Sequence, residues 1–113
     1  MDINEPLHPS VVIALWMKDW NIGVRRLAEA MAISPSAITR LLRGERKVSA
    51  ELAIRLAVVM GETPEHWMNL QNRYDLYFAN KVINREVLTV LYTDETKSSK
   101  VVRLNRELDK GSS

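Results

Sequence analysis

Residues 34–44 read SPSAITRLLRG, and this stretch decides the fold. Ser34 is a favoured helix N-cap, and Pro35 suits the first helical position. Gly44 is the residue type found most often just past a helix end. The stretch therefore predicts a short helix that runs to about Arg43. Its apolar residues recur at helical spacing on one side, at Ile38, Leu41 and Leu42.

The other side of this predicted helix carries small, hydroxyl and guanidinium side chains. An arginine can bind a guanine with two hydrogen bonds, and the methyl groups of alanine or threonine can meet a thymine methyl. The candidate base-reading residues are Ser36, Ala37, Thr39, Arg40 and Arg43. Taken alone, the stretch fits two interpretations equally: a DNA-reading helix, or an ordinary amphipathic helix with a solvated basic face.

The preceding segment gives this helix the layout of a helix-turn-helix. A helix is predicted over residues 24–31, and a tight turn at residues 32–33 follows it. Arg25 and Arg26 lie in the first turn of that helix, where the helix dipole favours acids, so we expect a phosphate to bind there. The other phosphate-binding candidates are two hydroxyls and two bases near the predicted reading helix: Ser34, Arg46, Lys47 and Ser49.

Charge is concentrated on the same segment. The whole chain of 113 residues has a net charge of only +2. Residues 21–60 hold seven Arg and Lys residues and three Glu residues, which leaves +4 on this part alone. A positive field centred on a helix-turn-helix pattern is typical of a DNA-binding domain.

The sequence gives little support to an enzyme or to a metal or cofactor site. It has no cysteine, which excludes disulfides and thiolate zinc sites and fits a reducing compartment. His8 and His66 have no partner at metal-ligand spacing, and His8 suits a capping role before Pro9. A glycine-rich phosphate loop is also absent from the sequence. We therefore expect a non-enzyme without cofactors.

The remaining pattern predicts an all-α, five-helix bundle. Helices are expected over residues 9–20, 24–31, 34–43, 50–60 and 64–81, after a lead-in at residues 1–8. The first helix has more apolar residues than one buried stripe needs. The surplus lies at Val11, Ala14 and Leu15. It either binds a partner or is covered by the C-terminal part of the same chain.

The pattern changes after the domain expected at residues 9–81. The extension at residues 82–93 contains VLTVLYT at 87–93, which predicts a short β-strand. A lone strand is unstable in water, so it would pair with a second copy of the chain, or the segment would be a buried extension of the bundle. We expect residues 94–113 to be disordered. With no signal peptide and no run of about 18 apolar residues, the sequence predicts a cytoplasmic protein.

Several of these motifs resemble those of the HigA antitoxins, which are phage-repressor-like helix-turn-helix proteins. The motifs are His8-Pro9, LAEAM at 27–31, the stretch at 34–44, AIRLA at 53–57, and TPEHWMNLQ at 63–71 followed by YDL at 74–76. The resemblance covers about residues 8–77, and the tryptophan-to-glutamine element after Thr63 is its most specific part. The sequence departs from the family at Ala32, where glycine is frequent, and at Gly23, where a hydroxyl cap is frequent.

The resemblance implies a homodimer that binds a palindromic DNA operator, represses its own operon and neutralises a RelE-like mRNA-cleaving toxin. We assign the toxin surface to Val11, Ala14 and Leu15. The dimer surface is assigned to Trp67, Leu70, Tyr74, Val87, Val90 and Tyr92. Two alternatives stay open: a stand-alone or phage-type repressor without a toxin, and a protein-interaction module that does not read DNA.

Overall fold

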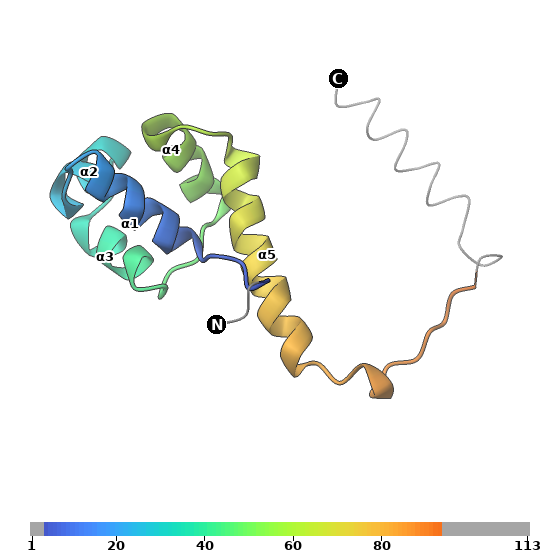
Figure 1. Ribbon diagram of the computed structural model, residues 1–113. Coiled ribbons are helices and arrows are strands. Elements are labelled where there is room, and N and C mark those ends of the chain that lie inside the picture. Colours follow the sequence, from blue (N-terminus) through green and yellow to red (C-terminus); the bar gives the residue numbers. More distant parts are fainter. Residues whose placement is uncertain (1–3, 94–113) are drawn as a thin grey trace, which may run out of the picture. The chain divides into compact units, whose positions relative to one another are not determined.

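The computed structural model describes residues 4–93, which form five α-helices and one 3-10 turn (Figure 1). The elements are α1 (Pro9–Asp19), α2 (Val24–Met31), α3 (Pro35–Leu42), α4 (Ala50–Met60), α5 (Pro64–Val82) and η1 (Arg85–Val87). The chain divides into two units, one ending at Val82 and one beginning at Ile83. The all-α helix-turn-helix fold predicted from the sequence is confirmed, and each helix begins within a residue or two of its expected start.

A side-chain cap precedes four of the five helices and explains where they begin. The imidazole of His8 accepts the Ser10 N–H at 3.0 Å, and the Ser34 hydroxyl accepts the Ala37 N–H at 3.2 Å. The hydroxyls of Ser49 and Thr63 accept the N–H groups of Leu52 and His66 in the same way, at 3.2 and 3.0 Å. Each cap satisfies a backbone donor that has no partner inside its own helix.

One core joins the five helices. Helix α3 packs against α1 and α2, while α4 packs against α2 and α5. The largest side chains with almost no solvent exposure are Ile13, Leu27, Met31, Ile38, Leu41, Leu52, Leu56 and Trp67. Full burial of each is worth roughly 1.5–3 kcal/mol. Because α3 supplies two of these residues, its inner face is fixed against the bundle and its outer face is held at a defined place.

The turn between α2 and α3 depends on one residue in the left-handed region. Ala32 has φ = 55°, and the next N–H, of Ile33, bonds to the Ala28 carbonyl at 3.0 Å. An L-residue with a Cβ pays roughly 1 kcal/mol in this conformation, whereas glycine adopts it freely. This cost is the physical reason that glycine suits this position.

Helix α5 runs past the packed part of the bundle (Figure 1). It has 19 residues, and Gln71 is the last of them that is buried. Beyond Gln71, Leu76 and Val82 are exposed. The second half of α5 therefore presents apolar side chains that the unit ending at Val82 leaves open to solvent.

The strand expected at residues 87–93 is wrong for the part of the chain that the structure describes. Residues 83–93 hold η1 and extended coil, and residues 4–93 contain no strand. The Asn84 side chain accepts the Glu86 N–H at 3.0 Å and starts the 3-10 turn. The alternative of a buried extension stays a prediction, because residues 83–93 belong to the second unit. Without a neighbouring strand, β-formers alone do not make a sheet. The disorder expected at residues 94–113 lies outside the described residues.

Candidate nucleic-acid interface

Helix α3 presents a polar face to solvent because its apolar face is locked into the core. Ile38 and Leu41 are fully buried, while Ser36, Arg40 and Arg43 on the other side of the helix are exposed and Thr39 is half-buried. Arg40 and Arg43 are exposed, and neither forms an ion pair within residues 4–93. Two long guanidinium side chains, one helical turn apart and without acidic partners, are available to reach into a groove of DNA.

The hydroxyl groups on this face are already oriented by the helix. Thr39 Oγ1 donates to the Pro35 carbonyl at 3.1 Å, so its proton is used within α3 and its lone pairs remain as acceptors. The Ser36 hydroxyl lies 3.1 Å from that of Ser34 at the helix start. Fixed hydroxyls lose little conformational freedom on binding, which favours a defined contact with a base or a phosphate.

The structure excludes one predicted base-reading residue. Ala37 is only 4% exposed and lies on the inner side of α3 with Ile38 and Leu41. Its methyl group cannot reach a base edge, so its assignment to the reading face is wrong. The helical period explains the error: residues 37, 38 and 41 lie on one side of an α-helix, and the small size of alanine hides this in the sequence.

The predicted phosphate-binding residues lie on α2, at the start of α3 and on the loop after α3. Arg25 and Arg26 are exposed in the first turn of α2, and Arg26 lies 3.6 Å from Glu29 in a solvated pair. Lys47 is exposed on the loop and lies 3.3 Å from Asp75 of α5. Arg46 is half-buried on the same loop, and Ser34 and Ser49 cap the helices on either side.

Two interactions that support this interface were missed from the sequence. Arg55 on α4 donates to the Met31 carbonyl at 2.8 Å, and it also pairs with Glu51 at 2.9 Å. It thereby ties the end of α2 to α4. Gln71 on α5 accepts the Val48 N–H at 2.9 Å and holds the loop after α3. Only the Glu51–Arg55 spacing of four residues was visible as a local signal.

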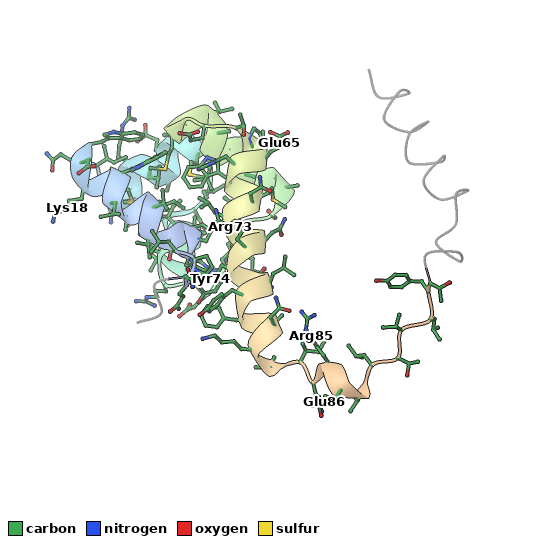
Figure 2. The ribbon with its side chains drawn as sticks, turned by 45° about the vertical axis from the view of Figure 1, so that its right-hand side comes forward. Lys18, Glu65, Arg73, Tyr74, Arg85 and Glu86 are labelled. Atoms are coloured by element: carbon green, nitrogen blue, oxygen red, sulfur yellow. The ribbon has the colours of Figure 1, made fainter. Side chains whose placement is uncertain are left out.

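The surplus apolar residues of α1 are exposed within the unit that ends at Val82. Val11 and Leu15 are 41% and 53% exposed, and Ala14 lies between them on the same open side. Val11 also lines a shallow pocket of about 190 Å³ with Leu7, His8 and Tyr74. Figure 2 shows Tyr74 on the side of α5 nearest to the start of α1. Within residues 4–82, nothing covers this strip.

One predicted dimer residue is also excluded. Trp67 is fully buried; its ring packs edge-on against Trp16 with centroids 5.5 Å apart, and its N–H donates to the Gly61 carbonyl at 3.0 Å. It is a core residue, and its assignment to a dimer surface is wrong. Leu70 and Tyr74 are half-buried on α5. Val87, Val90 and Tyr92 are exposed in the second unit.

The histidines and acids of the described residues do not gather into a site of another kind. No group of three or more metal-ligating side chains occurs within residues 4–93. His8 caps α1, as the sequence suggested, and its ring packs edge-on against Tyr74 at 4.7 Å. Burial lowers the pKa of His8 below its ordinary value of 6.5, against an opposing effect of the Asp75 carboxylate. Across the same range, every helix is too short or too polar to traverse a lipid bilayer.

Helices α2 and α3 are joined by a tight turn and pack their inner faces into the core, and α3 exposes a basic outer face. These features define the chain as a helix-turn-helix protein. A family model described as helix-turn-helix matches residues 19–67. The uncharacterized helix-turn-helix transcriptional regulator YddM of Escherichia coli K12 is 39% identical over 90 residues, which cover 80% of this chain and 95% of YddM.

Similar solved structures show which family of helix-turn-helix proteins the chain belongs to. An addiction module antidote protein of the HigA family from Coxiella burnetii is 35% identical, with a TM-score of 0.68, over 76% of this chain and 99% of its own. The Pseudomonas aeruginosa antitoxin HigA, solved with the higBA promoter, is 31% identical, also with a TM-score of 0.68, over 76% and 99%. The chain belongs to the HigA family of helix-turn-helix antitoxins.

Proposed function

We propose that this protein is a DNA-binding antitoxin that represses its own operon as a homodimer. The observation that carries the proposal is the outer face of α3, where Arg40 and Arg43 are exposed and lack acidic partners within the described residues. The P. aeruginosa relative solved with the higBA promoter supports the same role.

In the proposed complex, α3 of each copy enters the major groove of a palindromic operator. Arg40 and Arg43 bind guanine edges, while Ser36 and Thr39 contact bases at shorter range. The two α3 helices of a dimer then lie about 34 Å apart, one turn of DNA. The surrounding phosphate contacts come from Arg25, Arg26, Ser34, Arg46, Lys47 and Ser49.

The partner of the apolar strip on α1 is proposed to be a RelE-like, mRNA-cleaving toxin. The strip formed by Val11, Ala14 and Leu15 is exposed on a helix separate from the base-reading one. Contiguous apolar surface on a small protein marks an interaction site more often than a solvated face. Toxin binding and DNA binding would then use different helices of the same bundle.

The homodimer is proposed to use α5 and the second unit. Leu70 and Tyr74 supply partly open apolar surface on α5, and residues Val87, Val90 and Tyr92 supply exposed apolar side chains after it.

Fluorescence anisotropy tests the DNA-binding part. The full chain should bind a labelled duplex from the region upstream of its own gene at least a thousandfold more tightly than a random duplex. Equal affinity for both duplexes would contradict sequence-specific repression and would favour the protein-interaction module.

Co-expression tests the antitoxin part. A small basic reading frame next to the gene should encode a protein that co-purifies with this chain and that stops growth when expressed alone. Specific DNA binding without such a partner would leave the stand-alone repressor as the function.

A further inference from the structure

A buried amide on α5 connects two elements that the DNA-binding function needs. Gln71 is 3% exposed, and both ends of its amide are used. Its oxygen accepts the N–H of Val48, on the loop that follows α3, at 2.9 Å. Its nitrogen donates to Asp75 Oδ1, one turn further along α5, at 3.0 Å. The amide is therefore fixed in one orientation, and it fixes Asp75 relative to the loop.

The second oxygen of the same carboxylate binds a proposed phosphate contact. Asp75 Oδ2 lies 3.3 Å from Nζ of Lys47, the residue directly before Val48. The lysine side chain is 75% exposed and the aspartate 35% exposed, so this is a solvated pair that can exchange. An exposed pair of this kind shifts an equilibrium by no more than a few fold, which sets the size of the effect that it can have on binding.

A carboxylate at this distance reduces what a lysine gains from DNA. A cation that neutralises a phosphate releases condensed counterions, which adds about 0.9 to the salt dependence of binding on a log–log scale. A lysine that shares its charge with a fixed acid attracts the phosphate less. Gln71 bonds both to the Val48 N–H and to the Asp75 carboxylate, and these two bonds keep the carboxylate beside the loop that carries Lys47.

We propose that Asp75 is a positioning residue that restrains Lys47 from the DNA backbone, with Gln71 holding the carboxylate against the loop. Helix α5 thereby limits how tightly the loop after α3 binds phosphate. The inference rests on the proposed DNA binding and adds to it an acidic residue that weakens operator affinity. Because Asp75 lies on α5, outside the helix-turn-helix, operator affinity depends on a helix that does not itself approach the bases.

The test is Asp75→Asn in the full chain, with a labelled duplex from the region upstream of its own gene. Asparagine keeps an oxygen that can accept the Gln71 N–H, and it removes the negative charge. The variant should bind about two- to tenfold more tightly at low salt, and its salt slope should be steeper by up to about 0.9. A pH of about 8 keeps His8, whose pKa is lowered by burial, neutral in every variant.

Lys47→Met completes a double-mutant cycle. In the wild-type background it should change affinity by less than about twofold, because Asp75 already restrains the lysine. In the Asp75→Asn background it should abolish the gain. Glu65→Gln is the matched control: it removes one negative charge from the exposed start of the same helix (Figure 2) and should give a smaller change that Lys47→Met does not abolish.

Two failures are distinguishable. If the wild-type chain does not bind the duplex, the proposed function falls and the inference falls with it. If the wild type binds and Asp75→Asn, shown to be folded by circular dichroism, has unchanged affinity and salt slope, the inference alone is overturned. A gain that survives Lys47→Met would also overturn it, because the charge would then be acting on something else.

Discussion

Helices α1 and α3 start in the same way, but the exposed face of α3 is polar and basic whereas that of α1 is apolar. Each has a side-chain cap followed by proline, His8-Pro9 and Ser34-Pro35. Each packs its inner face into the same core and packs against the other helix. Yet α3 exposes arginines and hydroxyls, while α1 exposes valine, alanine and leucine. The start signal determines where a helix begins, and only the outer residues determine what it can bind.

The largest expected effect is the difference in unfolding free energy between removing a buried leucine and removing an exposed one. Leu41→Ala should lower the free energy of unfolding by about 2–5 kcal/mol, because Leu41 is fully buried on α3. Leu15→Ala, on the exposed strip of α1, should cost less than about 1 kcal/mol. Urea unfolding of the two variants measures the difference. Equal losses would mean that the outer face of α1 is packed in solution.

The second prediction concerns the partner of α1. Leu15→Asp should weaken toxin affinity at least tenfold, about 1.4 kcal/mol, because it places a charge in an apolar contact. It should leave DNA affinity unchanged. Arg40→Ala is the reciprocal control and should leave toxin affinity unchanged. Isothermal titration with the co-purified toxin measures both, and an intact complex with Leu15→Asp would move the toxin surface away from α1.

A smaller effect is expected at the turn into α3, where glycine should change the free energy of unfolding in opposite directions at two nearby alanines. Ala32→Gly should raise the free energy of unfolding by about 0.5–1 kcal/mol, because φ at this position is positive. Ala30→Gly, in the last turn of α2, should lower it by about 0.5–1 kcal/mol. Thermal unfolding of the pair gives the comparison, and a loss of stability with Ala32→Gly would contradict the left-handed turn.

The cap of α1 predicts the smallest effect, a pH dependence that the cap of α3 lacks. The folded-state pKa of His8 is lowered, so the folded chain favours the neutral ring. Stability from this residue is then complete above about pH 6.5 and falls as the pH drops below that value. His8→Asn keeps a capping acceptor and should flatten this part of the profile. Denaturant unfolding between about pH 5 and pH 8 is the measurement, and an unchanged slope would contradict the cap.

Most of the fold could be predicted from the sequence because its signals are local. A cap and a proline lie next to the helix they start, and the apolar period identifies the inner face of α2, α3 and α4. The same period places Ala37 on the buried face of α3. Because alanine is common on both buried and exposed helix faces, its residue type does not reveal this. Trp67 suits an interface or a core by composition, and only packing against Trp16 decides between them.

The contacts that fix the interface could not be predicted, because they join residues far apart in the chain. Arg55 bonds to Met31 across 24 positions, and Gln71 bonds to Val48 across 23. No local pattern encodes such a pair. The segment at residues 87–93 shows the reverse problem: its β-forming residues are a local signal for a strand whose partner the described chain does not contain.

The most direct test of the central claim, that α3 reads DNA, is the ratio of specific to random-duplex affinity in Arg40→Ala/Arg43→Ala. Each lost base contact should cost about 1–3 kcal/mol on the specific duplex, whereas binding to the random duplex should weaken less, so the ratio should fall at least tenfold. Arg73→Ala, which removes an exposed arginine from α5 (Figure 2), should leave the ratio unchanged. An undiminished ratio in the folded double variant would contradict the assignment of α3 as the reading helix.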